Sequence, residues 1–305
     1  MIKLQSLQKG DLVRILCTAR SAQIENLQPA ASFLRKMELR VDYGATIGKV
    51  YHQSGGTAQE RLADFLNAWN DPVVAAIWIA RGGYGTIQIL DGIDFASTYL
   101  DTNRQFQFIK PVIGYSDVTL IHSKMQRAGL PSIHTFMPLE ILSRSAFAKA
   151  SLKQALFGEK ITIEIANSGN LKSDHIAGTL YGGNLSILYS MLGSDDLPDF
   201  RNGILFIEEI DEYLYHLERM MFSLKRAGKL DGLKSLLVGG MTDMNDHDIP
   251  FGKTAFEIIK EQTTGYDYPV VFNVPAGHVK NNCTLKMGME MQIEITADAI
   301  TLTQE

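Results

Sequence analysis

"VVAAIWIARGGYG", residues 73–85, joins a run of apolar residues to a glycine-rich turn. A short apolar run bounded by such a turn is typical of a strand, expected here at residues 73–80. A helix is expected after it, near residues 84–91. The first half of the chain continues this alternation, with strands expected at residues 12–17, 39–44 and 107–115, and helices near residues 22–38 and 57–69 and from about residue 117. The alternation predicts an α/β domain in which crossover helices join parallel strands.

The pattern changes around residues 160–178, where apolar and polar residues alternate and Gly, Ser and Asn then gather. This change favours an exchange between domains, so we expect one domain at residues 1–165 and a second at residues 166–305. In the second domain we expect helices near residues 184–193, 213–227 and 252–262, strands at residues 203–210 and 235–241, and a terminal hairpin at residues 284–302. These elements predict a smaller domain of mixed α/β structure.

The composition is that of an ordinary globular protein in water. The 305 residues are 45% hydrophobic and 21% charged, with a formal net charge of -5. Because no basic stripe is present, nucleic acid is not an expected partner. No apolar run approaches the roughly 20 residues of a membrane span, and the N-terminus lacks a signal-peptide core. Cys17 and Cys283 are expected to stay reduced. We therefore expect a cytoplasmic protein without a membrane partner.

Ser116, in "VIGYSDVT" at residues 112–119, stands where an apolar strand ends and a helical pattern begins. A nucleophile elbow has this form, because its sharp turn holds the serine oxygen clear of the sheet beside a helix N-terminus. However, Val118 stands where the G-x-S-x-G pattern has its second glycine, and a serine at a helix start is commonly only an N-cap. The residues alone leave both interpretations open.

The turn "ARGGYGT", residues 80–86, is a second candidate site. Its backbone amides could hold an anion, and Arg81 could bind a carboxylate through two parallel hydrogen bonds. A tight turn with a surface arginine explains the same residues. A dinucleotide site is not favoured, because the third glycine of its fingerprint is missing at position 88.

A serine hydrolase also needs a base and an acid that orients the base. His134 and His278 are the candidate bases, because each follows an apolar strand and enters a loop. Glu208 and Glu209 are the candidate acids, since alternation along their strand should turn one carboxylate inward and the other outward. A solvated helix cap explains both carboxylates equally well. No metal-ligand motif is present, so neither a metal nor another cofactor is expected.

Five stretches together resemble the LD-carboxypeptidase family of serine peptidases, also called muramoyltetrapeptide carboxypeptidases. They are "ARGGYG", "VIGYSDVT", "GTLYGGNLS", "LFIEEIDEYLYHLERMM" and "VPAGHVKNNCTLKMG", in the order of the family. The resemblance implies a catalytic triad with Ser116 as nucleophile, His278 as general base and Glu208 as orienting acid. Glu209 is the alternative acid.

The resemblance implies a flavodoxin-like or glutamine-amidotransferase-like N-terminal domain, a smaller mixed C-terminal domain, and an active site in the cleft between them. It also implies an oxyanion hole made by the backbone N–H groups of Gly83 and Asp117. Arg81 and Asn184 are the expected substrate-binding residues. Thr135 is a departure, because many members of the family have Gly-Pro after the strand histidine.

The activity implied by the resemblance is removal of the terminal D-alanine from cytoplasmic murein tetrapeptides during cell-wall recycling, through an acyl-enzyme. A homodimer is implied as well. Two alternatives stay open: the chain could hydrolyse acyl-sulfamoyl adenylates, like the microcin-immunity branch of the family, or it could bind muropeptides without catalysis.

Overall fold

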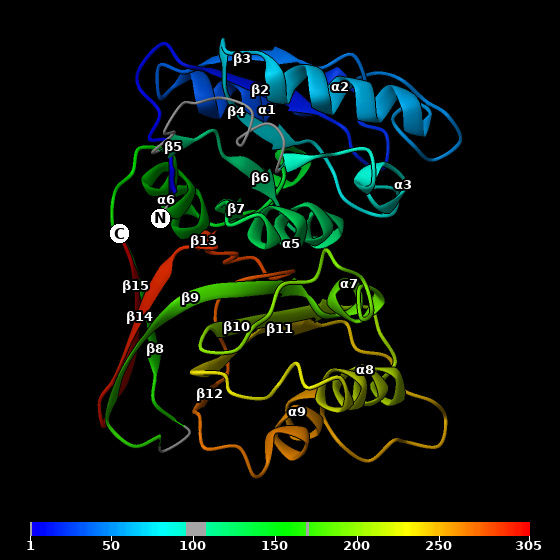
Figure 1. The fold of residues 1–305 in the computed structure, drawn as a ribbon. Helices are drawn as coiled ribbons and strands as arrows, with labels where there is room; N and C mark the ends of the chain where they lie inside the picture. Colours follow the sequence, from blue (N-terminus) through cyan, green and yellow to red (C-terminus); the bar gives the residue numbers. More distant parts are fainter. Residues whose placement is uncertain (1, 96–107, 169–170) are drawn as a thin grey trace.

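The structure is a computed structural model that describes residues 2–95, 108–168 and 171–305, and it contains two α/β units (Figure 1). The first unit is built on a six-stranded sheet in the order β13-β7-β6-β4-β2-β3. Its strands are β2 (Leu12–Leu16), β3 (Arg40–Tyr43), β4 (Val74–Ile79), β6 (Val112–Gly114), β7 (Ser132–His134) and β13 (Leu285–Met287). Paired neighbours are parallel except β13 and β7. This is the parallel sheet that the alternation predicts.

Every residue of β4 is buried, so the centre of this sheet is covered on both faces. The helices of this first half of the chain are α1 (Ile24–Arg35), α2 (Ala58–Asn70), α3 (Ile87–Leu90), α5 (Thr119–Arg127) and α6 (Ala146–Leu156). The helix α3 is shorter than predicted, because Gly83 and Gly85 have φ angles of +107° and +145° and the turn continues to Thr86.

The prediction of one continuous strand at residues 107–115 is wrong. Residue 107 lies outside the described residues, and the rest forms two strands, β5 (Phe108–Ile109) and β6. Pro111 separates them, since proline has no N–H to donate to a sheet. Only β6 joins the large sheet, whereas β5 pairs with β1 (Lys3–Leu4) in a separate two-stranded sheet.

The second unit is built on a seven-stranded sheet in the order β12-β11-β10-β9-β14-β15-β8. Its strands are β8 (Ile161–Ala166), β9 (Asp174–Asn184), β10 (Ile204–Ile210), β11 (Ser235–Thr242), β12 (Val270–Val271), β14 (Glu290–Ile295) and β15 (Ala299–Gln304), and its helices are α7 (Leu185–Ser190), α8 (Leu214–Arg226) and α9 (Ala255–Thr263). The strands β9 to β12 run parallel, whereas β14, β15 and β8 are antiparallel to their neighbours. This mixed sheet is the one expected from the second half.

The chain crosses between the two units more than once. The strand β8 pairs with β15 in the second sheet, so the predicted boundary between residues 165 and 166 falls at the end of a strand of that sheet. The strand β13 returns to the first sheet and lies beside β7 (Figure 1). Next to this pairing, the hydroxyl oxygens of Thr135 and Thr284 are 2.8 Å apart. These contacts tie the C-terminal segment to the carboxyl ends of the first sheet.

Both cysteines are free and buried. In the three described ranges, none of the helices is both long enough and apolar enough to cross a lipid bilayer.

Candidate active site

Ser116 lies on a sharp turn between β6 and α5. Its φ angle is +60°, in the left-handed region, which costs a residue with a Cβ about 1–2 kcal/mol. The turn can close because residue 114 is glycine, since a Cβ there would lie 2.9 Å from Cγ2 of Val118. Val118 is the N-cap of α5, and no side chain caps this helix. Ser116 is therefore not acting as an N-cap, and its strained conformation is that of a nucleophile elbow.

The glycine turn at residues 81–86 packs against this elbow. A Cβ at Gly82 would lie 3.4 Å from Oγ of Ser116. The carboxylate of Asp117, which is 2% exposed, accepts a hydrogen bond of 2.9 Å from the backbone N–H of Thr86. Burial raises the pKa of Asp117, although the hydrogen bonds from Thr86 oppose this effect. Asp117 therefore fixes the turn that carries Gly83 beside the serine.

The two predicted substrate-binding side chains make hydrogen bonds within the protein. The guanidinium of Arg81 is half-buried and donates to the backbone carbonyl of Ser21 at 3.4 Å. Asn184 is 4% exposed, caps α7 through its Oδ1, and donates from Nδ2 to Glu209 at 2.9 Å. Asn184 therefore holds α7 and Glu209 in place, and its contact with a substrate stays a prediction.

Glu208 and His278 form a buried pair on the second unit. Oε2 of Glu208 lies 2.7 Å from Nδ1 of His278 and also accepts the backbone N–H of His278 at 3.1 Å. Gly277 allows this approach, because its φ angle is +97° and a Cβ there would lie 2.6 Å from the same oxygen. Burial lowers the pKa of His278, but the charge and hydrogen bond of Glu208, together with the charges of Glu140 and Glu209, outweigh burial, so the net shift is upward. With Nδ1 bound to Glu208, Nε2 is free to take a proton from a nucleophile.

Glu209 is also buried, at 2% exposed, which corrects the expectation that one of the two carboxylates turns outward. The reason is that α7 covers the second face of β10: Oε2 of Glu209 accepts the backbone N–H of Ser186 at 2.6 Å, and Oε1 accepts from Asn184. Burial raises the pKa of Glu209 to about 7. Of the two candidate acids, Glu208 is therefore the one that contacts a histidine.

His134, the other candidate base, is fully buried, and neither of its ring nitrogens has a hydrogen-bond partner among the described residues. Burial holds the pKa of its imidazole well below the ordinary value. Its ring packs against the rings of Tyr115 and Phe206, with centroids 5.7 Å and 5.2 Å away. A buried imidazole that solvent cannot reach is not placed to take a proton during a reaction with a bound substrate, so His278 is the better candidate base.

Tyr115 connects the two halves of the site. It precedes Ser116, and the centroid of its ring lies 4.6 Å from that of His278. Its hydroxyl donates to Glu140 at 2.7 Å and accepts from Arg144 at 2.9 Å, and Arg144 also donates to the carbonyl of Val279. Sequence reasoning missed this network, although Tyr115 lies inside the "GYSD" stretch.

Among the hydrogen bonds between described residues, none joins Oγ of Ser116 to His278. Such contacts are often long in ligand-free enzymes and tighten when substrate binds. The structure thus brings together Glu208 with His278 and Tyr115 with His278, while the contact of Ser116 with the imidazole stays a prediction.

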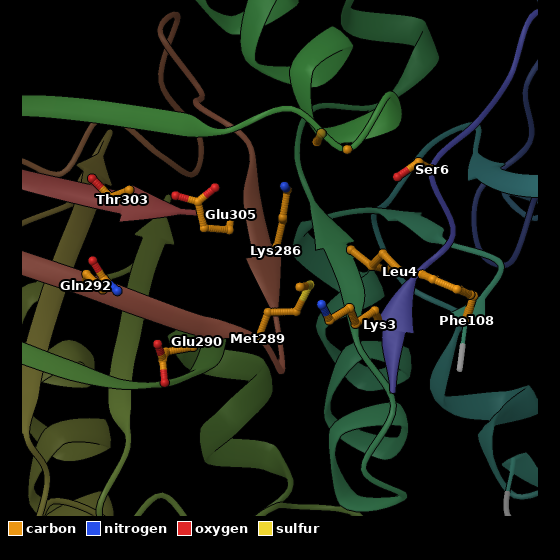
Figure 2. Close-up of a pocket in the computed structure, with 12 residues that line it drawn as sticks. Lys3, Leu4, Ser6, Phe108, Lys286, Met289, Glu290, Gln292, Thr303 and Glu305 are labelled. Atoms are coloured by element: carbon orange, nitrogen blue, oxygen red, sulfur yellow. The ribbon is translucent and has the colours of Figure 1, made fainter. Parts of the chain in front are cut away.

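The pocket in Figure 2 lies elsewhere, where β1 meets β13 and the β14–β15 hairpin. It has a volume of about 560 Å³, and its lining includes Lys3, Lys286 and Glu305 but none of the predicted site residues. In the described ranges of the chain, His, Cys, Asp and Glu side chains nowhere form a group of three or more that could hold a metal ion.

A strained serine turn on one α/β unit, beside a buried carboxylate–histidine pair on the other, has the parts of a serine hydrolase. Comparison with known proteins gives the family. The model of the LD-carboxypeptidase N-terminal domain matches residues 13–135, and that of the LD-carboxypeptidase C-terminal domain matches residues 177–293. The chain belongs to the LD-carboxypeptidase family, and the expected class of enzyme, a serine carboxypeptidase, is confirmed.

Individual relatives agree with this assignment. The chain is 35% identical over 243 residues to the probable murein peptide carboxypeptidase of Bacillus subtilis (strain 168), covering 77% of this chain and 74% of the relative. It is 30% identical over 275 residues to the murein tetrapeptide carboxypeptidase of Pseudomonas aeruginosa, covering 86% and 87%. The crystal structure of muramoyltetrapeptide carboxypeptidase from Oxalobacter formigenes superposes with a TM-score of 0.83 at 26% identity, covering 95% of this chain and 98% of that one. The expected two-domain α/β fold is thereby confirmed.

Proposed function

We propose that this protein removes the terminal D-alanine from murein tetrapeptides, with Ser116 as nucleophile, His278 as general base and Glu208 as the acid that orients it. The observation that carries the proposal is the buried Glu208–His278 pair beside Tyr115, the residue that precedes Ser116. The murein peptide substrates named for the relatives support the choice of substrate.

In the first step, Oγ of Ser116 attacks the carbonyl carbon of the last peptide bond and passes its proton to Nε2 of His278. The Glu208 carboxylate stabilises the imidazolium that forms. The negative charge on the former carbonyl oxygen is stabilised by the N–H groups of Gly83 and Asp117, which lie on the glycine turn and the elbow. His278 then gives the proton to the amine of the leaving D-alanine, and the peptide remains as an ester on Ser116.

In the second step, a water molecule gives a proton to His278 and attacks the ester carbonyl. The collapse of this intermediate returns the proton from His278 to Oγ of Ser116 and releases the shortened peptide. The same imidazole therefore serves as base and acid twice in each turnover. This cycle needs His278 to be neutral when substrate binds.

The biological setting is part of the proposal. We infer that the enzyme works in the cytoplasm on peptides recovered from the cell wall, which agrees with the substrate named for its Pseudomonas aeruginosa relative. We also infer that two chains form a homodimer. Sedimentation of the purified protein tests the dimer, and fractionation of cells tests the location.

The experiment that tests the function uses Ser116→Ala with free murein tetrapeptide, and mass spectrometry identifies the products. Wild-type protein should release D-alanine, and the variant should lose turnover by a factor on the order of 10⁶ while its circular dichroism is unchanged. Ser123→Ala is the matched control, since Ser123 lies on the adjacent α5 and its buried hydroxyl makes no hydrogen bond to any residue that the structure describes.

Near-normal turnover by Ser116→Ala would exclude Ser116 as nucleophile. Wild-type protein that binds tetrapeptide without releasing D-alanine would instead be a binding protein. Cleavage of an acyl-sulfamoyl adenylate in preference to the tetrapeptide would assign the chain to the microcin-immunity activity.

A further inference from the structure

The proposed reaction requires a group that recognises a free carboxylate. A carboxypeptidase cleaves the bond before the last residue, so the carboxylate carbon of that residue lies only about 4 Å from the scissile carbonyl carbon. Arg binds a carboxylate well, because its planar fork donates two parallel hydrogen bonds and keeps its charge. The residue sought is therefore a cation with free donors close to Ser116 and the glycine turn.

Arg20 meets the requirement of position. Its side chain crosses the glycine turn: a Cβ at Gly83 would lie 2.6 Å from Cδ of Arg20 and 2.7 Å from its Nε. The adjacent Gly82 faces Oγ of Ser116, which would lie 3.4 Å from a Cβ there. Of these two consecutive glycines, Gly82 thus faces the predicted nucleophile and Gly83 faces the Arg20 side chain. The absence of a side chain at Gly83 leaves room for Arg20.

Arg20 also has free donors. Its side chain is exposed, and within the part of the chain that the structure describes its guanidinium makes no hydrogen bond, ion pair or ring contact. The other arginines near the turn are engaged: Arg61 is 1% exposed and donates to the carbonyls of Thr18 and Gly85, and Arg81 donates to Ser21. Of these three guanidinium groups, that of Arg20 is the one available to a ligand.

The backbone around Arg20 is held in place, which gives its side chain a defined origin. Arg20 forms an isolated antiparallel bridge with Ser54, and the N–H of Ser21 donates to the carbonyl of Gln53 at 3.0 Å. The N–H of Gly55 donates to the carbonyl of Ala19, also at 3.0 Å. A charge mounted on a fixed loop loses less conformational freedom when it binds a ligand.

We infer that Arg20 binds the C-terminal carboxylate of the substrate, an assignment that rests on the proposed function. The carboxylate accepts two hydrogen bonds from N–H groups of the Arg20 guanidinium, while the scissile carbonyl oxygen faces the N–H groups of Gly83 and Asp117. Arg20 is then a specificity residue, because it makes a free terminal residue the preferred leaving group. Arg81, the cation expected from the sequence, donates to the backbone carbonyl of Ser21 instead.

The test compares Arg20→Met, which keeps an unbranched apolar stem but removes the charge, with wild-type protein on two substrates. One is murein tetrapeptide with its free D-alanine carboxylate, and the other is the same peptide ending in D-alaninamide. The variant should lose about 10- to 100-fold in kcat/KM on the acid, mainly through KM, and should be unchanged on the amide. Arg20→Lys should recover part of the loss. Arg35→Met, at the far end of α1, should match wild type on both substrates.

The outcomes separate the two proposals. Wild-type protein that releases nothing from either substrate contradicts the proposed function and, with it, the role of Arg20. Wild-type protein that cleaves the acid while Arg20→Met keeps its KM, or loses equally on both substrates, overturns the role of Arg20 alone. An acid-specific loss in Arg81→Met but not in Arg20→Met would move the carboxylate site to Arg81. Equal thermal unfolding temperatures for Arg20→Met and Arg35→Met show that the comparison is between folded proteins.

Discussion

Replacing Glu208 with Gln tests the proposed relay with almost no change of side-chain volume. In the wild-type protein, Oε2 of Glu208 accepts hydrogen bonds from both Nδ1 and the backbone N–H of His278. Oε1 is buried and has no hydrogen-bond partner within residues 2–95, 108–168 and 171–305. If the glutamine keeps its oxygen toward His278, its NH₂ group takes the place of Oε1 and has no acceptor. If it turns over, its NH₂ group faces the backbone N–H of His278 and drives the ring proton from Nδ1 to Nε2. Either arrangement weakens His278 as a base.

The expected loss is large. The equivalent acid-to-amide change in another serine protease lowers kcat by about 10⁴, and each factor of ten corresponds to about 1.36 kcal/mol of activation free energy. We expect a loss of similar size, or about 5.4 kcal/mol, because His278 contacts Glu208 directly at 2.7 Å. The residual activity should come from the oxyanion donors and substrate binding.

The pH dependence gives a second readout that a general loss of structure would not produce. Neutral His278 is the active form, and its pKa is raised in the wild-type protein, so kcat/KM should fall as the pH drops through a value above about 6.5. Without the Glu208 charge, burial is the largest remaining influence on His278 and favours the neutral ring. The pKa of His278 should then fall, and the residual activity should persist to a lower pH. Release of D-alanine, measured from about pH 5 to about pH 9, gives both profiles.

The reasoning would be refuted by a Glu208→Gln variant that keeps more than about a tenth of the wild-type kcat. A pH midpoint that stays in place or moves upward would contradict the electrostatic part. Glu209→Gln is the matched control, since Glu209 is the neighbouring buried carboxylate and bonds to Asn184 and Ser186 rather than to His278. It should shift the midpoint far less.

Two further variants test the surroundings of the pair. Gly277→Ala should lower kcat/KM at least about 100-fold, because the new Cβ would collide with the Glu208 side chain. The control Gly265→Ala has a similar φ of +94° and open space around the new Cβ, so it should have the same backbone cost of about 1–2 kcal/mol and keep its activity. Equal activities in the two variants would contradict the contact between residue 277 and Glu208. Glu209→Gln should show a pH-dependent stability difference from wild type in urea unfolding. The pKa of Glu209 is raised to about 7 in the folded protein, so the stability that it contributes is present below its unfolded value of about 4.5 and is lost as the pH rises through 7. The wild-type advantage should therefore shrink from about pH 5 to about pH 8, and a constant difference would contradict the raised pKa.

Local patterns in the sequence predicted most of the elements that position the site. The strand predicted at residues 73–80 is Val74–Ile79, and the helix predicted near residues 213–227 is Leu214–Arg226. These segments are specified by their own burial pattern, so neighbours in sequence suffice to predict them. The exceptions have local causes that the pattern does not weigh, such as the missing N–H of Pro111 within one predicted strand.

The sequence by itself determined the order of most strands and helices, the position of Ser116 between a strand and a helix, and a short set of candidates for the base and the acid. Only the tertiary structure decided among those candidates. In the folded protein, Glu208 contacts His278, and α7 covers Glu209. His134 is buried in the core, and the Arg20 side chain lies close to Gly83. The physical reason is that each of these contacts joins residues far apart in the chain, so it depends on how strands and loops from distant segments pack together. No local periodicity carries that information.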